Sequence, residues 1–151
     1  MSNTGASTVP AAILRRTYNA SRERVFAAWT QPEIAARFLG PDDITIPKVE
    51  MDVRTGGSYR IAMHRPDGET WYVGGVYREV RAPERLCMTW RWEEDNTADE
   101  HESLLTLEFN EVNGGTELVL IHEQLATEES RAGHESGWSM ILDKLATTLE
   151  N

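Results

Sequence analysis

The order of the predicted helices and strands limits the fold of this chain more than any other feature of its sequence. Two short helices are expected near the N-terminus, in segments 20–29 and 30–38. A strand at 13–18 precedes them, about six strands follow, and an amphipathic helix at 131–149 closes the chain. A curved antiparallel sheet that wraps around one long helix tends to leave a hollow between the two. The order therefore predicts an α+β fold with six to seven strands, and with it a candidate cavity for a small ligand.

Short-range signals mark where several of these elements begin or bend. Ser21 is expected to cap the first helix, and Thr30 with Glu33 to form a capping box at the second. Gly74 and Gly75 lie inside the strand predicted at 70–80 and indicate a bulge or a bend there.

Length, charge and cysteine content narrow the class of protein. The 151 residues suffice for one domain, predicted at 12–151 after a disordered polar tail at 1–11. A net charge of −10 and a pI of about 4.8 argue against a nucleic-acid partner, which requires a basic face. No apolar run is long enough to span a membrane, and the N-terminal segment does not read as a secretory signal. The single cysteine, Cys87, agrees with a reducing compartment, so a cytoplasmic location is expected. The acidity of the chain also argues against a membrane partner.

The candidate pocket residues are those whose spacing turns them toward the space between the sheet and the last helix. Leu86, Met88, Trp90 and Trp92 share one strand face, and Trp138 lies on the apolar stripe of the closing helix. These aromatic rings either fill a solid core or line a pocket for a flat or apolar ligand. The predicted ligand-binding set is Phe38, Tyr59, Met63, Trp71, Tyr77, Trp90, Trp92, His122, His134, Trp138 and Leu142.

The sequence offers two histidines as candidate catalytic residues and no recognised metal-binding pattern. His122 and His134 could act as general acid or base inside a cavity, or could be hydrogen-bonded histidines at its rim. The glycines around Ser136 do not have the spacing of a nucleophile elbow. There is no cysteine pair and no His-Glu-x-x-His pattern, so neither a metal nor a cofactor is predicted. The catalytic residues, if any, stay unknown.

Several segments of the chain together resemble one known superfamily. They are RTYNASRERVFAAW at 16–29, GGSYR at 56–60, GVYREV at 75–80, PERL at 83–86, TW at 89–90, GTEL at 115–118 and GW at 137–138. Their order and spacing are similar to those of the SRPBCC, or START-like, superfamily. The resemblance is to the branch related to the C-terminal domain of the activator of the ninety-kilodalton heat-shock-protein ATPase, and it covers about residues 12–150.

The resemblance implies a helix-grip fold, in which a curved sheet grips the long terminal helix around a cavity suited to apolar ligands. It does not imply one activity, because the superfamily includes lipid carriers, hormone receptors, polyketide cyclases and co-chaperone domains. Three functions stay open at this point. They are binding of a small hydrophobic or aromatic molecule, catalysis on an aromatic or polyketide-like molecule in the same cavity, and a chaperone-associated interaction module. A homodimer is a further expectation.

Overall fold

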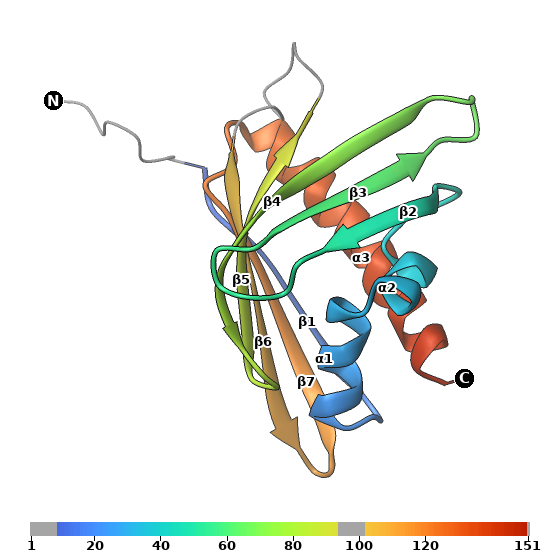
Figure 1. The fold of residues 1–151 in the computed structure, drawn as a ribbon. Coiled ribbons are helices and arrows are strands. Elements are labelled where there is room, and N and C mark those ends of the chain that lie inside the picture. Colours follow the sequence, from blue (N-terminus) through green and yellow to red (C-terminus); the bar gives the residue numbers. More distant parts are fainter. Residues whose placement is uncertain (1–8, 94–101, 151) are drawn as a thin grey trace, which may run out of the picture.

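The computed structural model describes residues 9–93 and 102–150 and contains ten helices and strands within them. In chain order they are β1 (Ala12–Tyr18), α1 (Arg22–Thr30), α2 (Pro32–Phe38), β2 (Thr45–Met51), β3 (Ser58–His64), β4 (Thr70–Arg81), β5 (Arg85–Trp92), β6 (Ser103–Val112), β7 (Gly115–Glu123) and α3 (Glu128–Leu149). Figure 1 shows this order, with the two short helices after the first strand and the long helix last.

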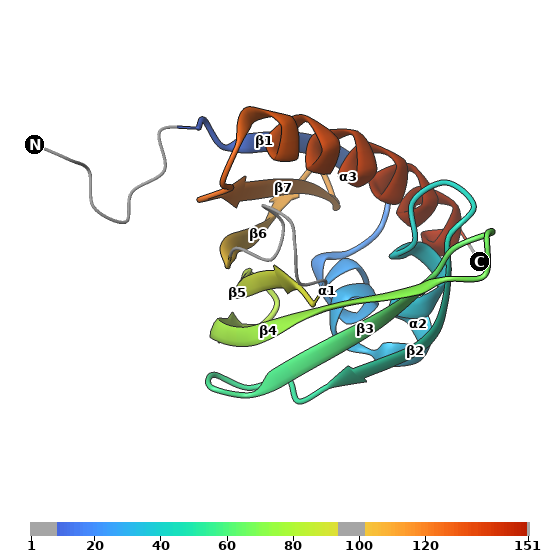
Figure 2. The same ribbon diagram turned by 90° about the horizontal axis from the view of Figure 1, so that it is seen from above.

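The strands form one antiparallel sheet in the order β1-β7-β6-β5-β4-β3-β2. Strands β2 to β7 follow one another as a meander. The last strand, β7, then pairs with the first, β1, along the whole length of β1. Seen from above, the strands follow a curved arc, and α3 lies across its concave side (Figure 2). The predicted α+β helix-grip architecture is therefore confirmed.

The core lies between the concave face of the sheet and α3. Alternate residues of β6 and β7, among them Leu105, Leu107, Phe109, Leu118 and Leu120, point inward and are almost fully buried. Helix α3 meets them with the apolar stripe that helical spacing predicts from His134 to Leu149. Its buried members are Trp138, Ile141, Leu142, Leu145 and Leu149. This stripe fixes which side of α3 faces the sheet.

Of the two capping predictions for the first two helices, one is confirmed and one is wrong. The Ser21 hydroxyl caps α1 as expected, because its oxygen accepts from the backbone N–H of Arg24 at 3.2 Å. The Thr30–Glu33 capping box is wrong. Gln31 is the N-cap of α2 and makes no side-chain cap, and the Thr30 hydroxyl donates to the Phe26 carbonyl oxygen at 2.9 Å.

The start of α3 and the irregularity of β4 lie at other positions than predicted. Helix α3 begins at Glu128, three residues before the predicted start, because the Thr127 hydroxyl caps it by accepting from the Ser130 N–H at 3.0 Å. The irregularity of β4 falls between Tyr77 and Glu79, just after the two glycines.

The predicted tail at 1–11 falls mostly outside the described residues, and it stays a prediction together with the single domain at 12–151. Among the helices within 9–93 and 102–150, none combines the length and the apolar character that a membrane span requires.

Candidate ligand pocket

A pocket of about 490 Å³ lies between strands β3 to β5 and the first half of α3. Its walls include four tryptophans, namely Trp71, Trp90, Trp92 and Trp138, and we call it the indole pocket. Met63 of β3, Ile141 of α3 and Pro41 from the α2–β2 loop complete its apolar lining.

The four indoles meet edge to face or tilted rather than in flat stacks. The ring centroids of Trp90 and Trp138 lie 4.9 Å apart, and those of Trp90 and Trp92 lie 6.0 Å apart with the planes at 87°. Trp71 meets Trp92 at 6.2 Å and 79°. These are favourable aromatic contacts, so the walls are held by one another as well as by the sheet.

The helix side of the pocket is lined by small and polar residues. Gly133 and Gly137 leave the surface of α3 without side chains there, and Thr127, Glu129, Ser130 and His134 supply the polar groups. A Cβ built on Gly133 would have no atom of a neighbour within 4 Å. The first turns of α3 therefore leave space in front of the indoles.

His134 holds one wall of the pocket in place. Its Nε2 accepts from the Trp92 Nε1–H at 3.0 Å, and its Nδ1 lies 2.8 Å from the Ser130 carbonyl oxygen. An Nε2 that accepts carries no proton, so the neutral ring must carry its proton on Nδ1 and donate it to Ser130. This tautomer satisfies both nitrogens.

His122 fixes the orientation of Trp138, another wall of the pocket, without lining the pocket itself. Its Nδ1 accepts from the Trp138 Nε1–H at 3.0 Å, and its Nε2 lies 2.7 Å from the Ser103 hydroxyl oxygen, which donates to the Trp90 carbonyl at 2.9 Å. The ring is fully buried, and burial, followed by the nearby His134, lowers the pKa of His122 well below its usual value. The residue is thus neutral at pH 7, with its proton on Nε2.

The two histidines lie close together, with ring centroids 4.8 Å apart at 74°. They do not bond to each other, since each of their four nitrogens already contacts a tryptophan, a serine hydroxyl or a carbonyl. The geometry makes both residues orienting groups for Trp92 and Trp138.

The structure brings together six of the eleven residues predicted to bind ligand. Lining the indole pocket are Met63, Trp71, Trp90, Trp92, His134 and Trp138. The other five lie outside its lining. Phe38 packs edge to face on Trp29, and Leu142 lies in the core, where its carbonyl accepts from the Tyr18 hydroxyl. His122 lies behind Trp138, and Tyr59 and Tyr77 contact each other deeper in the sheet.

Seven lining residues were not in the predicted set, namely Pro41, Thr127, Glu129, Ser130, Gly133, Gly137 and Ile141. Most belong to α3 or its cap. Ser130, Gly137 and Ile141 fall on the helical face that carries His134 and Trp138. Gly137 and Ile141 lie within the predicted helix, whereas Ser130 could be identified only from the earlier helix start.

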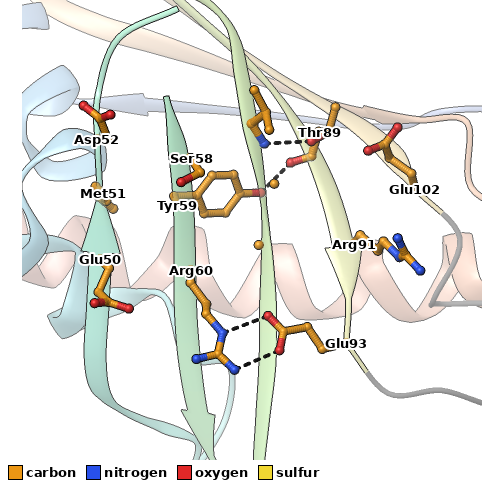
Figure 3. Close-up of a pocket in the computed structure, with 13 residues that line it drawn as sticks. Glu50, Met51, Asp52, Ser58, Tyr59, Arg60, Thr89, Arg91, Glu93 and Glu102 are labelled. Carbon is orange, nitrogen blue, oxygen red and sulfur yellow. Dashed lines mark hydrogen bonds and ion pairs between the residues drawn. The ribbon is translucent and has the colours of Figure 1, made fainter. Parts of the chain in front are cut away.

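A second hollow, of about 920 Å³, lies on the outer face of the sheet (Figure 3). Several of its charged side chains are paired with neighbours on the sheet surface. Arg60 makes a bidentate pair with Glu93, with both N–O distances at 2.9 Å, and this pair lowers the pKa of Glu93. Asp52 at its edge pairs with Arg54 at 3.0 Å. We therefore interpret the ion pairs of this outer hollow as ordinary contacts on the surface of the sheet, and we take the indole pocket as the candidate site.

Within the described parts of the chain, no three His, Cys, Asp or Glu side chains are grouped as metal ligands would be.

Comparison with known proteins places the fold in a family. The family model described as "Activator of Hsp90 ATPase homolog 1-like protein" matches residues 19–150. A comparison with curated proteins finds no match.

Solved structures share the fold of this chain. Protein CV1439 from Chromobacterium violaceum superposes with a TM-score of 0.84 at 24% identity, covering 93% of this chain and 97% of the other. The AHSA1 protein from Silicibacter pomeroyi has a TM-score of 0.81 at 27% identity over the same shares. CalU16 from Micromonospora echinospora has a TM-score of 0.70 at 26% identity, covering 92% of this chain and 75% of the other.

Proposed function

The chain belongs to the Activator of Hsp90 ATPase homolog 1-like family, and we propose that it binds a small, largely apolar aromatic molecule in the indole pocket. The observation that carries this proposal is a pocket of about 490 Å³ with four indoles in its walls. That volume lies within the range of about 300–1,000 Å³ found for small-molecule sites. The START-like fold commonly holds hydrophobic ligands between sheet and helix, which supports the same function.

The chemistry of the lining favours a flat apolar molecule. Indole rings offer large apolar faces and pair with other aromatic rings edge to face or offset. The polar groups that can orient a ligand gather on one side of the pocket, at Thr127, Glu129 and Ser130. Affinity would come from the tryptophans and orientation from this helix side.

The alternative functions have less support. Catalysis needs an ionisable group free to exchange a proton with the ligand, but His134 of the lining and His122 behind it use all their nitrogens in contacts within the protein. The other ionisable residue of the lining, Glu129, is exposed to solvent.

An interaction module needs an exposed apolar patch, and the large hydrophobic residues exposed within the described chain are Ile13, Val76 and Met140. Ile13 and Met140 line one hollow between β1 and α3, but Arg15, Arg16 and Glu135 line it too, so its surface is not an apolar patch. A cytoplasmic location and a homodimer stay predictions.

Filling the pocket from the helix side tests the proposal. The Gly133→Leu variant places a side chain in the open space that Gly133 leaves, and Ser136→Leu adds the same side chain to an exposed position of α3 outside the pocket lining. Naphthalene is titrated into 15N-labelled protein, and the five tryptophan Nε1–H resonances are followed.

We expect naphthalene to bind the wild type and Ser136→Leu alike, and to bind Gly133→Leu at least about tenfold more weakly because the leucine occupies its site. The leucine also replaces a helical glycine, so the variant should fold at least as stably as the wild type. Equal affinity for Gly133→Leu would place naphthalene elsewhere and overturn the proposal.

A further inference from the structure

The α2–β2 loop contributes one apolar residue, Pro41, to the lining of the indole pocket. Its ring lies beside Gly137 of α3, where a built Cβ would meet the Cβ and Cγ atoms of Pro41 at 4.0 Å. Proline has no backbone N–H, so Pro41 cannot hold its own place by donating a hydrogen bond. The position of this wall therefore depends on the residues around it.

Lys144 of α3 holds the loop on both sides of Pro41. Its Nζ donates to the Gly40 carbonyl oxygen at 2.5 Å and to the Asp42 carbonyl oxygen at 2.6 Å. Within residues 9–93 and 102–150, no other side chain forms a hydrogen bond with residues 40–43. Hydrogen bonds from an ammonium group are stronger than those between neutral groups. These two bonds thus tie the backbone next to Pro41 to α3.

The backbone of the loop needs this support. Asp42 has a φ of 53°, in the left-handed region that residues other than glycine rarely adopt. The Ile44 N–H donates to the Pro41 carbonyl oxygen at 3.0 Å and closes the turn. A backbone conformation of this kind persists where the surrounding structure holds it, and Lys144 binds the Asp42 carbonyl itself. Loss of the ammonium group is therefore expected to release the turn, and Pro41 with it.

Lys144 is not part of the pocket lining. It follows Ile141, which does line the pocket, by three residues along α3. An effect of Lys144 on a bound molecule must then pass through the loop that it holds.

We propose that Lys144 is a positioning residue of the indole pocket, which holds Pro41 against a bound aromatic molecule through the Gly40 and Asp42 carbonyls. This inference rests on the proposed function, since it concerns the ligand of that same pocket. It adds that a residue outside the lining controls how tightly the pocket binds an aromatic molecule.

A double-mutant cycle on naphthalene binding tests this inference. Lys144→Met keeps the aliphatic part of the side chain and removes the ammonium group, whereas Pro41→Ala removes the wall. Arg24→Met is the control, because it removes another cationic donor to a backbone carbonyl, that of Leu149 at the C-terminal end of α3. Neither Arg24 nor Leu149 lines the indole pocket.

We expect Lys144→Met and Pro41→Ala each to weaken naphthalene binding about fivefold, because each removes the same apolar contact. The double variant should also bind about fivefold more weakly, whereas independent effects would multiply to about 25-fold. Arg24→Met should change the dissociation constant less than about twofold. A loss of stability alone would not couple Lys144 to Pro41 in this way.

A second measurement needs no variant. In the wild type, the ring protons of Pro41 should show nuclear Overhauser effects to bound naphthalene. Absence of these effects, an unchanged dissociation constant in Lys144→Met, an equal loss in Arg24→Met or multiplying effects in the double variant would each overturn the inference and leave the proposed function standing. Failure of naphthalene to bind the wild type would overturn both.

Discussion

At the scale of single residues, His122 shows how the pocket wall depends on a proton. The neutral ring accepts from Trp138 through Nδ1, and a protonated ring could not, because both of its nitrogens would then be donors. Burial and the neighbouring His134 lower the pKa of His122 well below its ordinary value. Acid is therefore expected to act on this residue through the stability of the whole fold.

The sign of the effect follows from the direction of that shift. As the pH falls below about 6.5, the histidine of the unfolded chain takes up a proton while His122 in the fold does not. The unfolded state then binds more protons, so the free energy of unfolding falls as the pH is lowered, by at most about 1.4 kcal/mol per pH unit. This loss continues until the pH reaches the lower pKa of the folded protein.

Urea unfolding of the wild type and of His122→Gln, measured between pH 8 and pH 5, checks this prediction. A glutamine can accept from Trp138 and donate to Ser103 but does not titrate, so the variant should show a flatter dependence below pH 6.5. His64→Gln is the control, because His64 is exposed at the end of β3. Identical slopes in the wild type and His122→Gln would assign the acid sensitivity to other groups.

At the scale of secondary-structure elements, the closeness of β3, β4 and β5 depends on Gly75. The Tyr59 hydroxyl of β3 reaches past β4 and donates to the Thr89 carbonyl oxygen of β5 at 2.5 Å, and the Thr89 hydroxyl accepts from the Val76 N–H at 2.8 Å (Figure 3). A Cβ built on Gly75 would lie 2.1 Å from that same carbonyl oxygen. This part of the sheet has no room for a side chain at the glycine.

Gly75→Ala is accordingly expected to lower the free energy of unfolding by about 2 kcal/mol or more, because β4 and β5 must separate to admit the methyl group. Gly137→Ala is the opposite case. Its Cβ would meet Pro41 at 4.0 Å, an ordinary contact, and the change should stabilise α3 by about 1 kcal/mol. Denaturant unfolding of the two variants beside the wild type would contradict this account if both changed stability in the same direction.

Much of the element order was predictable because its signals are local. Inward alternation in β5 to β7 and the stripe on α3 follow from periodicities that the sequence shows directly. The capping box failed because Thr30 has a competing acceptor one turn back, at the Phe26 carbonyl, which no sequence spacing reveals. The start of α3 was placed too late because residues 128–133 are polar or small and continue no apolar stripe.

The pocket was less predictable than the fold, since its lining depends on side-chain direction beyond the strand face. Tyr59 occupies an inward position as predicted, but its side chain extends across β4 instead of toward α3. His122 is also on the predicted face, and the Trp138 ring that bonds to it lines the pocket in its place. Strand phase predicts the face on which a residue lies, whereas tertiary contacts decide which side chains reach the pocket.

At the scale of the whole molecule, one ligand should stabilise sheet and helix together, because the indole pocket is lined by β3 to β5 on one side and by α3 on the other. A ligand that binds the folded state alone stabilises it by RT ln(1 + [L]/Kd). Naphthalene at about ten times its Kd should therefore add about 1.4 kcal/mol to the free energy of unfolding. For a chain of this length, that corresponds to a rise in Tm of about 3–6 °C.

Thermal unfolding monitored by circular dichroism, with and without naphthalene, measures this rise. The gain in the free energy of unfolding should follow the logarithm of the naphthalene concentration above Kd, because the ligand acts by mass action on the folded state. Gly133→Leu should unfold at the same temperature with and without naphthalene, because its leucine occupies the space that the ligand needs. A rise in Tm of equal size in Gly133→Leu would mean that the stabilising site lies outside the indole pocket. A rise confined to the wild type and Ser136→Leu would show that binding in that pocket stabilises the arrangement of α3 and the sheet.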